Sequence, residues 1–250
     1  MTKSSLSDRV RAIILGSLLG DGSLRIHRPY RNARFSFRHS VNQTDYFHWK
    51  ANQLKEVSSE RSAWEQPRDG FGGTKLRYQS LALESLTELY RLTHRQNRLD
   101  IRRRWLNQLT PLSLAIWWLD DGSLTVNTRK GVFCTDGFSQ EGVKRLAKYL
   151  STVWDIGNHI GKVKPARFSQ RRPERYRIWL RSTEELKKFL RIILPHVPVP
   201  AMLPKVILLY RDSQLQQRWI SEVGQLSKFP RNVVERYAAE KRSRWQRFRE

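Results

Sequence analysis

The sequence contains few of the residues that form disulfides or zinc sites. Cys134 is the single cysteine among 250 residues, which excludes a disulfide framework and a cysteine zinc site. The six histidines are scattered without metal-ligand spacing, which argues against a histidine-metal nuclease. Neither a glycine-rich phosphate loop nor a nucleophilic serine motif is present. Nucleotide hydrolysis and acyl transfer therefore lack the residues that they require.

Acidic residues are scarce, with 23 Asp and Glu against 47 Lys and Arg, which gives a net charge of +24. A protein this basic requires a polyanionic partner. The sequence has no lipidation signal and no long apolar span, so nucleic acid is favoured over a membrane surface. Residues 1–4 do not resemble a signal peptide, so we expect an intracellular protein, in an organelle or the bacterial cytoplasm, and not a secreted one.

Two stretches 100 residues apart share one pattern, an apolar helix that runs into an Asp-Gly-Ser-Leu corner: ILGSLLGDGSL at 14–24 and LAIWWLDDGSL at 114–124. We expect each helix to end at its glycine, Gly22 or Gly122, in a left-handed conformation. Asp21 and Asp121 then lie at the negative end of a helix dipole, where a hard divalent cation would stabilise them. If the copies pack about a pseudo-twofold axis, both aspartates meet in one metal site. The alternative is two buried helices that each end in a common Asp-Gly turn.

Hydrophobic periodicity predicts the element order αββαββα in each copy. In the first copy we expect strands at 24–28, 33–39 and 75–80, a short strand within the loop 58–73, and helices at 44–57 and 83–92. In the second copy we expect strands at 124–128, 131–135, 160–168 and 175–181, and helices at 140–153 and 184–194. The predicted division is an N-terminal domain at 1–94, a basic linker at 95–109, a C-terminal domain at 110–200 and a basic helical extension at 201–250.

The linker and the extension each allow two interpretations. The linker lies along a polyanion backbone as a partly helical segment, or it is a solvated face without a partner. The extension should contain helices at 203–219 and 233–249, and its strongly basic second helix either clamps nucleic acid or forms a frayed tail.

Basic residues concentrate in the predicted strands and hairpins. Residues 33–39 alternate, with arginines on one face and Phe35 and Phe37 on the other, as in a half-buried strand. Arginines on strands can reach base edges in a major groove, and those at hairpin tips can reach phosphates; contact with phosphate or solvent alone stays open for each. The candidate DNA-binding residues are Arg25, Arg28, Arg31, Arg34, Arg38, Lys75, Arg77, Arg129, Lys130, Lys162, Lys164, Arg167, Arg171, Arg172, Arg175, Arg177 and Arg181.

The stretches GSLLGDG at 16–22 and WWLDDGS at 117–123 resemble the two LAGLIDADG motifs of a single-chain homing endonuclease. The resemblance implies an α+β fold of two pseudo-symmetric αββαββα domains, whose antiparallel sheets form a DNA-binding saddle. It also implies a monomer that cuts both strands of a double-stranded DNA target across the minor groove and leaves 3′ overhangs. Such proteins are encoded within introns, and binding to the protein's own intron RNA is a further implied activity.

The resemblance assigns roles to particular residues. Asp21 and Asp121 would be the catalytic metal ligands, and the backbone carbonyls of Gly20 and Asp120 would be the second contributors. The expected cofactor is Mg²⁺, with Mn²⁺ as a substitute, and Ca²⁺ should bind without supporting cleavage. The metal would activate a water for attack on a phosphodiester and stabilise the leaving 3′ oxygen. Candidates for ordering the catalytic waters are Ser40 or His39 in the first unit and Thr135 or Asp136 in the second.

This sequence departs from the motif at two positions of the second copy. Ile116 stands where the first copy has Gly16, so Ser113 and Ala115 are the small residues available for close helix packing, which should be asymmetric. Asp120 stands where the first copy has Gly20, and it is either structural or a minor contributor to the site. An alternative function is an RNA-binding intron maturase, or a nucleic-acid-binding protein without cleavage activity. Retention of both Asp21 and Asp121 favours the nuclease, because carboxylates near phosphates would otherwise repel them.

Overall fold

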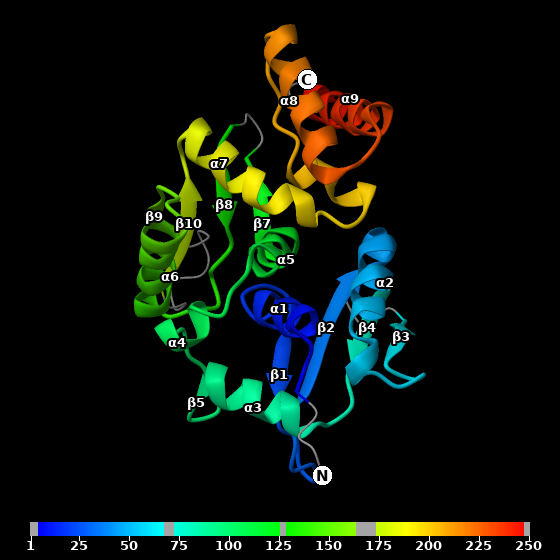
Figure 1. The fold of residues 1–250 in the computed structure, drawn as a ribbon, viewed down its shortest axis with the longest axis vertical. Coiled ribbons are helices and arrows are strands. Elements are labelled where there is room, and N and C mark those ends of the chain that lie inside the picture. The colour runs from blue at the N-terminus through cyan, green and yellow to red at the C-terminus, as the bar shows by residue number, and fades with distance from the viewer. Residues whose placement is uncertain (1–4, 68–72, 126–128, 164–173, 248–250) are drawn as a thin grey trace. The chain divides into compact units, whose positions relative to one another are not determined.

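The computed structural model of the chain describes residues 5–67, 73–125, 129–163 and 174–247. The chain divides into two compact units, Met1–Asp120 and Asp121–Glu250. Each unit contains one four-stranded antiparallel sheet with helices packed against it (Figure 1). The boundary falls at the end of helix α5 (Pro111–Asp121), so that nearly all of this helix counts with the first unit.

Unit 1 contains the first predicted repeat. Its sheet has the strand order β1-β2-β4-β3. The elements in chain order are α1 (Asp8–Ser17), β1 (Ser23–Arg25), β2 (Arg34–Ser40), α2 (Thr44–Gln53), β3 (Ala63–Gln66), β4 (Lys75–Gln79), α3 (Glu84–Thr93), β5 (His94–Arg95), β6 (Arg98–Leu99), α4 (Arg103–Leu106) and α5. Short 3₁₀ turns at Val41–Gln43 and Lys55–Val57 flank α2.

The sheet of unit 1 has one apolar face and one polar face, as the alternation of residues 33–39 predicts. Phe35, Phe37 and His39 on β2 are buried, whereas Arg34 and Arg38 point to the other face. Helices α2 and α3 both contact β2. The ring of Phe37 lies 5.4 Å from that of Phe47 on α2, which places α2 on the apolar face. Helix α2 therefore covers the apolar side chains of this sheet.

Unit 2 repeats this order of elements. After the end of α5 come β7 (Gly122–Leu124), β8 (Gly131–Phe133), α6 (Gln140–Val153), β9 (His159–Val163), β10 (Arg175–Leu180) and α7 (Thr183–Ile193). The strand order β7-β8-β10-β9 matches that of unit 1 position by position. Helix α6 begins and ends at the predicted residues. The predicted α+β class with two αββαββα repeats is confirmed.

Residues 93–108 are more ordered than a partly helical linker. Strands β5 and β6 form a short hairpin, with Gln96 and Asn97 at φ values of 50° and 60°. The Nη2 of Arg102 donates hydrogen bonds to the carbonyls of Leu92 at 2.6 Å and Arg91 at 3.1 Å, near the C-terminus of α3. This arginine therefore satisfies carbonyls that the end of a helix leaves unpaired.

The C-terminal extension differs from the prediction in its first helix. Residues 203–219 are not one helix: a 3₁₀ helix at Pro200–Lys205 is followed by an irregular segment and by α8 (Ser213–Ser227). Asp212 fixes the start of α8 by accepting a hydrogen bond from the Leu215 amide at 2.7 Å. Gln216 satisfies the buried backbone before it, accepting from the Tyr210 amide at 2.8 Å and donating to the Leu208 carbonyl at 3.1 Å.

The last helix, α9 (Arg231–Arg247), packs on α8 and on the 3₁₀ helix before it. Val234 and Ala238 are buried in this packing. Of the two interpretations of the extension, a frayed tail is therefore wrong for these residues. None of the helices in the described part of the chain is both long and apolar enough to cross a membrane.

Candidate active site and nucleic-acid face

The corner after α1 is built by an unusually close turn of the main chain. Beyond Ser17 the chain continues in tight turns, and the amide of Gly22 donates to the Ser17 carbonyl at 2.7 Å. A Cβ at Gly22 would lie 2.8 Å from that carbonyl oxygen. The prediction of a left-handed Gly22 was wrong: glycine is required here for close approach of the backbone, while its φ lies outside the left-handed range.

The small residues of α1 allow it to pack closely on α5. A Cβ at Gly16 would lie 2.4 Å from the carbonyl oxygen of Ser113, and the Ser113 hydroxyl donates to the Ala12 carbonyl at 3.0 Å. Ser113 thus serves as the small residue on the second helix, as predicted, and the contact is asymmetric. The turn that carries Asp21 is held against α5 by this contact.

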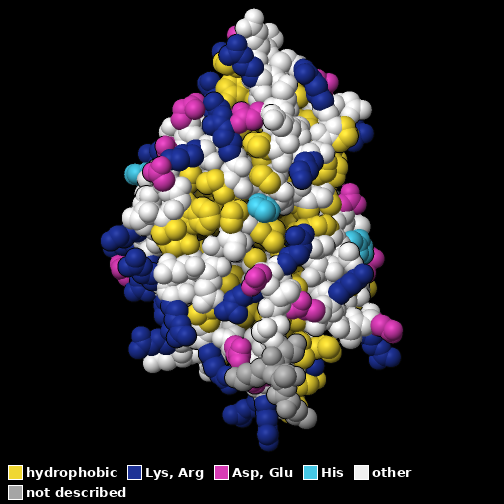
Figure 2. Space-filling model, in the orientation of Figure 1, with side chains coloured by type: hydrophobic (Ala, Val, Ile, Leu, Met, Phe, Trp, Pro, Cys, Tyr) yellow, Lys and Arg dark blue, Asp and Glu magenta, His cyan; other side chains and the backbone are white. Residues whose placement is uncertain are grey.

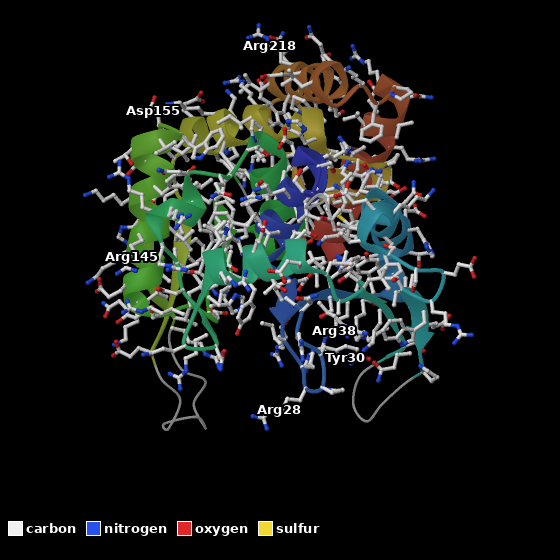
Figure 3. All side chains as sticks on the ribbon, turned by 60° about the horizontal axis from the view of Figure 1, so that its bottom comes forward. Arg28, Tyr30, Arg38, Arg145, Asp155 and Arg218 are labelled. Carbon is white, nitrogen blue, oxygen red and sulfur yellow. The ribbon has the colours of Figure 1, made fainter. Side chains whose placement is uncertain are left out.

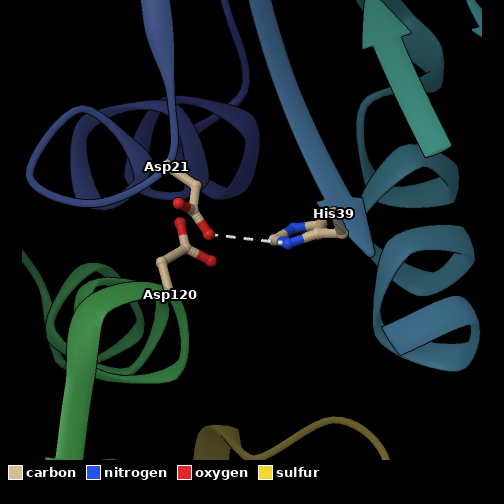
Figure 4. Close-up of side chains that lie close together, drawn as sticks. All are labelled: Asp21, His39 and Asp120. Atoms are coloured by element: carbon tan, nitrogen blue, oxygen red, sulfur yellow. Dashed lines mark ion pairs between the residues drawn. The ribbon is translucent and has the colours of Figure 1, made fainter. Parts of the chain in front are cut away.

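Three side chains converge where these elements meet (Figure 4). Asp21 comes from the corner after α1, His39 from β2 and Asp120 from the end of α5, and one ligand atom of each lies within 4.8 Å of the others. His39 Nδ1 is 3.5 Å from Asp21 Oδ2. The His39 side chain is 1% exposed and that of Asp21 is 39% exposed, so Asp21 is the member of the group that solvent reaches.

The side chain of Asp120 belongs to a buried hydrogen-bond cluster. Lys50 Nζ donates to its two oxygens at 2.9 and 2.7 Å, and Tyr46 Oη donates to one of them at 2.9 Å. Burial raises the pKa of Tyr46 well above its ordinary value, and the negative charges of Asp120 and Asp21 raise it further. Tyr46 therefore stays a hydrogen-bond donor throughout the physiological pH range.

Lys50 is a site residue that the sequence analysis missed. It was passed over because it lies on the apolar stripe of α2, next to Phe47 and four residues after Tyr46. A lysine on a buried helix face requires a buried acceptor, since a lone buried ammonium is strongly unfavourable. That requirement is the signal that could have found it.

The four candidates for ordering water lie in different settings. His39 adjoins Asp21, whereas Ser40 accepts a hydrogen bond from the Asn42 amide at 3.4 Å and begins a 3₁₀ turn. In unit 2, the Thr135 hydroxyl donates to the Tyr176 carbonyl at 2.6 Å. Asp136 accepts two hydrogen bonds from Arg177, at 2.9 and 2.5 Å. His39 thus lies 3.5 Å from one aspartate of the repeated motif, and in unit 2 the amide of Cys134, directly before Thr135, donates to the carbonyl of the other, Asp121, at 3.1 Å.

The polar face of the unit 1 sheet presents ordered rows of basic and polar groups. Strand register pairs Arg25 with Arg34 in one row and Arg38 with Arg77 in another, and Lys75 pairs with Ser40 in a third. Cross-strand partners share a face of the sheet. A cavity of about 610 Å³ on this face is lined by Arg25, Arg38, Arg77 and Asp21, among others. Three of the predicted basic strand residues and Asp21 therefore border one concave surface.

Trp64 is a second residue that the sequence analysis missed on this face. It pairs with Arg77 across the sheet, lines the same cavity and is 42% exposed. The hairpin between β1 and β2 carries Arg28 and Tyr30, and Arg28 projects beyond its tip (Figure 3). The guanidinium of Arg34 lies 3.9 Å from the centre of the Tyr30 ring. Arg31, also predicted, is exposed in this hairpin.

In unit 2 the predicted basic residues lie in several environments. Arg175 and Arg177 occupy alternate positions of β10, and Arg177 is paired with Asp136. Lys162 pairs with Tyr176 in the strand register, on the face opposite to those arginines, and forms an ion pair with Glu174. Arg129, Lys130 and Arg181 are at or near the surface; the Arg129 guanidinium lies 5.7 Å from the Tyr210 ring centre. Lys164, Arg167, Arg171 and Arg172 lie outside the described residues.

The model of the LAGLIDADG DNA endonuclease family matches residues 11–189, which contain both motif corners and both sheets. The chain belongs to the LAGLIDADG DNA endonuclease family. The homing endonuclease I-WcaI, solved bound to its DNA recognition sequence, has the same fold, with a TM-score of 0.70 at 19% sequence identity. The match covers 83% of this chain and 89% of that one.

The curated relatives include proteins named RecA, a DNA endonuclease and an mRNA maturase. The chain is 28% identical over 217 residues to protein RecA of Mycobacterium gastri, covering 81% of this chain and 48% of that protein. It therefore spans about half the length of this relative. It is 28% identical to DNA endonuclease I-ChuI of Chlamydomonas applanata, covering 63% and 78% of the two chains. It is 27% identical to cytochrome b mRNA maturase bI2 of Saccharomyces cerevisiae, covering 63% and 39%.

Proposed function

We propose that this chain is a site-specific homing endonuclease that cuts both strands of its DNA target and depends on a divalent metal ion. The observation that carries the proposal is the position of Asp21. This partly exposed carboxylate lies at a helix-end corner, borders a cavity lined by arginines, and recurs as Asp121 in the second motif. The similarity to DNA endonuclease I-ChuI supports the same reading.

The residues of the two corners fit a hard divalent cation. Asp21 and Asp121 supply carboxylates, and Gly20 and Asp120 supply main-chain carbonyls, which are the oxygen ligands that Mg²⁺ prefers. Mn²⁺ accepts the same ligands. When bound, such a cation activates water for attack on a phosphodiester and stabilises the leaving 3′ oxygen. Because Asp21 is partly exposed, a hydrated ion and a phosphate could approach it from solvent.

The protein's own groups bind and orient the substrate. The basic polar face of each sheet would hold double-stranded DNA, with phosphate contacts fixing its register and base contacts selecting its sequence. His39 is buried beside Asp21, where its ring can hold a water in a fixed orientation. We infer that the protein acts as an intracellular monomer, is encoded within an intron, and cuts across the minor groove to leave 3′ overhangs.

The decisive experiment incubates the protein with a DNA library of candidate intron insertion sites in Mg²⁺, Mn²⁺, Ca²⁺ or EDTA. Wild type should make double-strand cuts at one sequence in Mg²⁺ or Mn²⁺ and bind without cutting in Ca²⁺. Asp21→Asn and Asp121→Asn should each reduce cleavage by about 100-fold or more, because each removes a charged ligand from the metal site. Target binding should be unchanged or tighter, since a charge that repels phosphate has been removed. Normal cleavage by Asp21→Asn would remove Asp21 from the mechanism.

A second candidate function is that of an intron maturase, because the similarity to maturase bI2 covers 63% of this chain. The same proteins should then be tested for binding to a structured intron RNA. Tight RNA binding without DNA cleavage would assign the protein to splicing and leave the two aspartates with a structural role. Cleavage together with RNA binding would show that both activities are present.

A further inference from the structure

Asp120 places a charged side chain where the first motif has Gly20. Its side chain and that of Lys50 are both fully buried (0% exposed). Lys50 Nζ bonds both carboxylate oxygens, and Tyr46 Oη bonds one of them, at distances of 2.7 to 2.9 Å. Lys50 and Tyr46 are four residues apart on α2 and so lie on the same face of that helix. A buried carboxylate and a buried ammonium require each other, so these three side chains form one cluster.

The corner after α1 leaves space for this cluster. A Cβ at Gly20 would lie 2.5 Å from the Asp120 Cβ and 3.2 Å from one carboxylate oxygen. Any larger residue at position 20 would push the Asp120 side chain away from α2. A glycine after α1, an aspartate at the end of α5 and a lysine on α2 are thus fitted to one another, although up to 100 residues separate them.

The cluster directly adjoins Asp21. One carboxylate oxygen of Asp120 lies within 4.8 Å of a ligand atom of Asp21 and of one of His39 (Figure 4), and the His39 and Tyr46 rings are 5.2 Å apart. An uncompensated carboxylate at this place would repel Asp21 and compete with it for a cation. Lys50 compensates the charge of Asp120 and engages both of its oxygens.

We propose that Lys50 and Tyr46 are positioning residues of the active site, with the Asp120 side chain as their anchor and not as a cation ligand. The anchor fixes the last turn of α5 against α1 and α2. That turn carries the Asp120 carbonyl and the Asp121 carboxylate assigned to the cation under the proposed function, on which this inference rests. Lys50 also keeps the Asp120 carboxylate away from the cation, so that the site does not gain a third charged ligand.

The test compares Lys50→Met with the double variant Lys50→Met, Asp120→Leu in the full chain. Terbium(III), a hard cation whose emission is excited through nearby tryptophans, measures cation binding without catalysis. In Lys50→Met the carboxylate of Asp120 is released beside Asp21, so terbium should bind about tenfold more tightly. Cleavage in saturating Mg²⁺ should nevertheless fall at least about tenfold, since the end of α5 has lost its anchor.

The double variant separates position from charge. An apolar pair of similar volume replaces the ion pair, so the free energy of unfolding should return toward that of wild type. Terbium affinity should stay within about threefold of wild type, because the remaining ligands are unchanged. Cleavage should remain low. Tyr46→Phe removes one of the three hydrogen bonds and should lower cleavage by a smaller factor without changing terbium affinity.

Lys144→Met is the matched control, because it removes an ammonium from an exposed pair with Glu141 on α6. This variant should match wild type in every assay.

Weaker terbium binding by Lys50→Met, in proportion to lost stability, would give Lys50 a purely structural role and overturn the proposal. Loss of terbium binding in the double variant would make Asp120 a ligand and also overturn it. Wild-type cleavage by the double variant would exclude positioning while leaving the endonuclease intact. A wild type that binds no terbium and cuts no DNA would remove the proposed function itself.

Discussion

At Gly16 the main chains of α1 and α5 lie too close together for a side chain. A Cβ there would meet the Ser113 carbonyl oxygen at 2.4 Å and the Ser113 Cα at 2.9 Å, and both atoms belong to a helix backbone that cannot move aside. Gly16→Ala should therefore destabilise the protein by about 1–3 kcal/mol, as overpacking does elsewhere. The effect should exceed the gain of up to about 1 kcal/mol in helix propensity that alanine brings.

Urea unfolding measures this free energy. Gly137→Ala is the control, because a Cβ at Gly137 would have no atom within 4 Å and its φ is ordinary. The control should unfold as wild type does. A Gly16→Ala variant as stable as wild type would show that α1 and α5 can separate at no cost, and that the small residues of the motif are unnecessary for stability.

At the residue scale, sequence patterns found the repeated corner but not its surroundings. Asp21 could be proposed because the motif recurs, and His39 was one of two candidates in its unit because the resemblance implies a residue that orders water there. Lys50 could not be proposed, because its partner Asp120 is 70 residues away and only the fold brings α2 to the end of α5. Trp64 was missed for a related reason: its strand is short and polar, and it pairs with β4 at the edge of the sheet.

At the scale of elements, α9 is attached to the rest of unit 2 through Lys241, whose side chain is partly buried. Lys241 Nζ donates to the carbonyls of Pro204 and Ile207, at 2.6 and 2.8 Å. Burial lowers the pKa of Lys241 to about 7. Between this value and the ordinary lysine pKa of 10.5 the unfolded chain binds the extra proton, so the free energy of unfolding should rise with pH across that window. The slope from one proton is about 1.4 kcal/mol per pH unit at most.

The measurement is urea unfolding of wild type and Lys241→Met from pH 6 to pH 9.5. All other groups titrate alike in both proteins, so the difference between the two curves isolates Lys241. Wild type should gain stability relative to the variant as the pH rises above 7, with no further change below it. Parallel curves would show that the ammonium is solvated, and that α9 does not bury it against the 3₁₀ helix.

Hydrophobic periodicity predicted most helices and strands. It failed where a side chain, and not another main-chain group, forms the hydrogen bonds of the backbone. Helix α6 has the predicted bounds because its apolar stripe and its N-cap Ser139, which accepts from the Gly142 amide at 3.1 Å, agree. The apolar residues 206–210 also suited a helix, yet Gln216 satisfies their backbone in an irregular conformation. Hydrophobic periodicity contains no signal for a side chain that replaces helical hydrogen bonds six to eight residues away.

At the scale of the whole molecule, the two units share a topology but differ in their use of charge. The polar face of the unit 1 sheet carries Arg38 and Arg77 in one row, whereas Arg177 in unit 2 is bound to Asp136. Lys and Arg side chains are also spread widely over the surface in view, with Asp and Glu among them (Figure 2). Net charge alone therefore does not identify the DNA-binding face. A test must distinguish the effect of charges on the polar sheet face from that of charges elsewhere on the surface.

The salt dependence of DNA binding distinguishes these two effects for the proposed endonuclease. Binding that neutralises six to ten phosphates should weaken by about 10³- to 10⁵-fold between 50 and 200 mM salt, through release of counterions. Arg38→Gln, on the polar sheet face, should reduce the slope of log affinity against log salt by about one. Arg145→Gln is the control, because it removes the same charge from the exposed side of α6 (Figure 3). Helix α6 packs on strands β9 and β10 of the unit 2 sheet, so Arg145 does not lie on the polar face of the unit 1 sheet. The slope of this variant should equal that of wild type. If both variants reduced the salt slope equally, DNA would be attracted by the total charge of the protein and would not bind specifically to the polar face of the sheet.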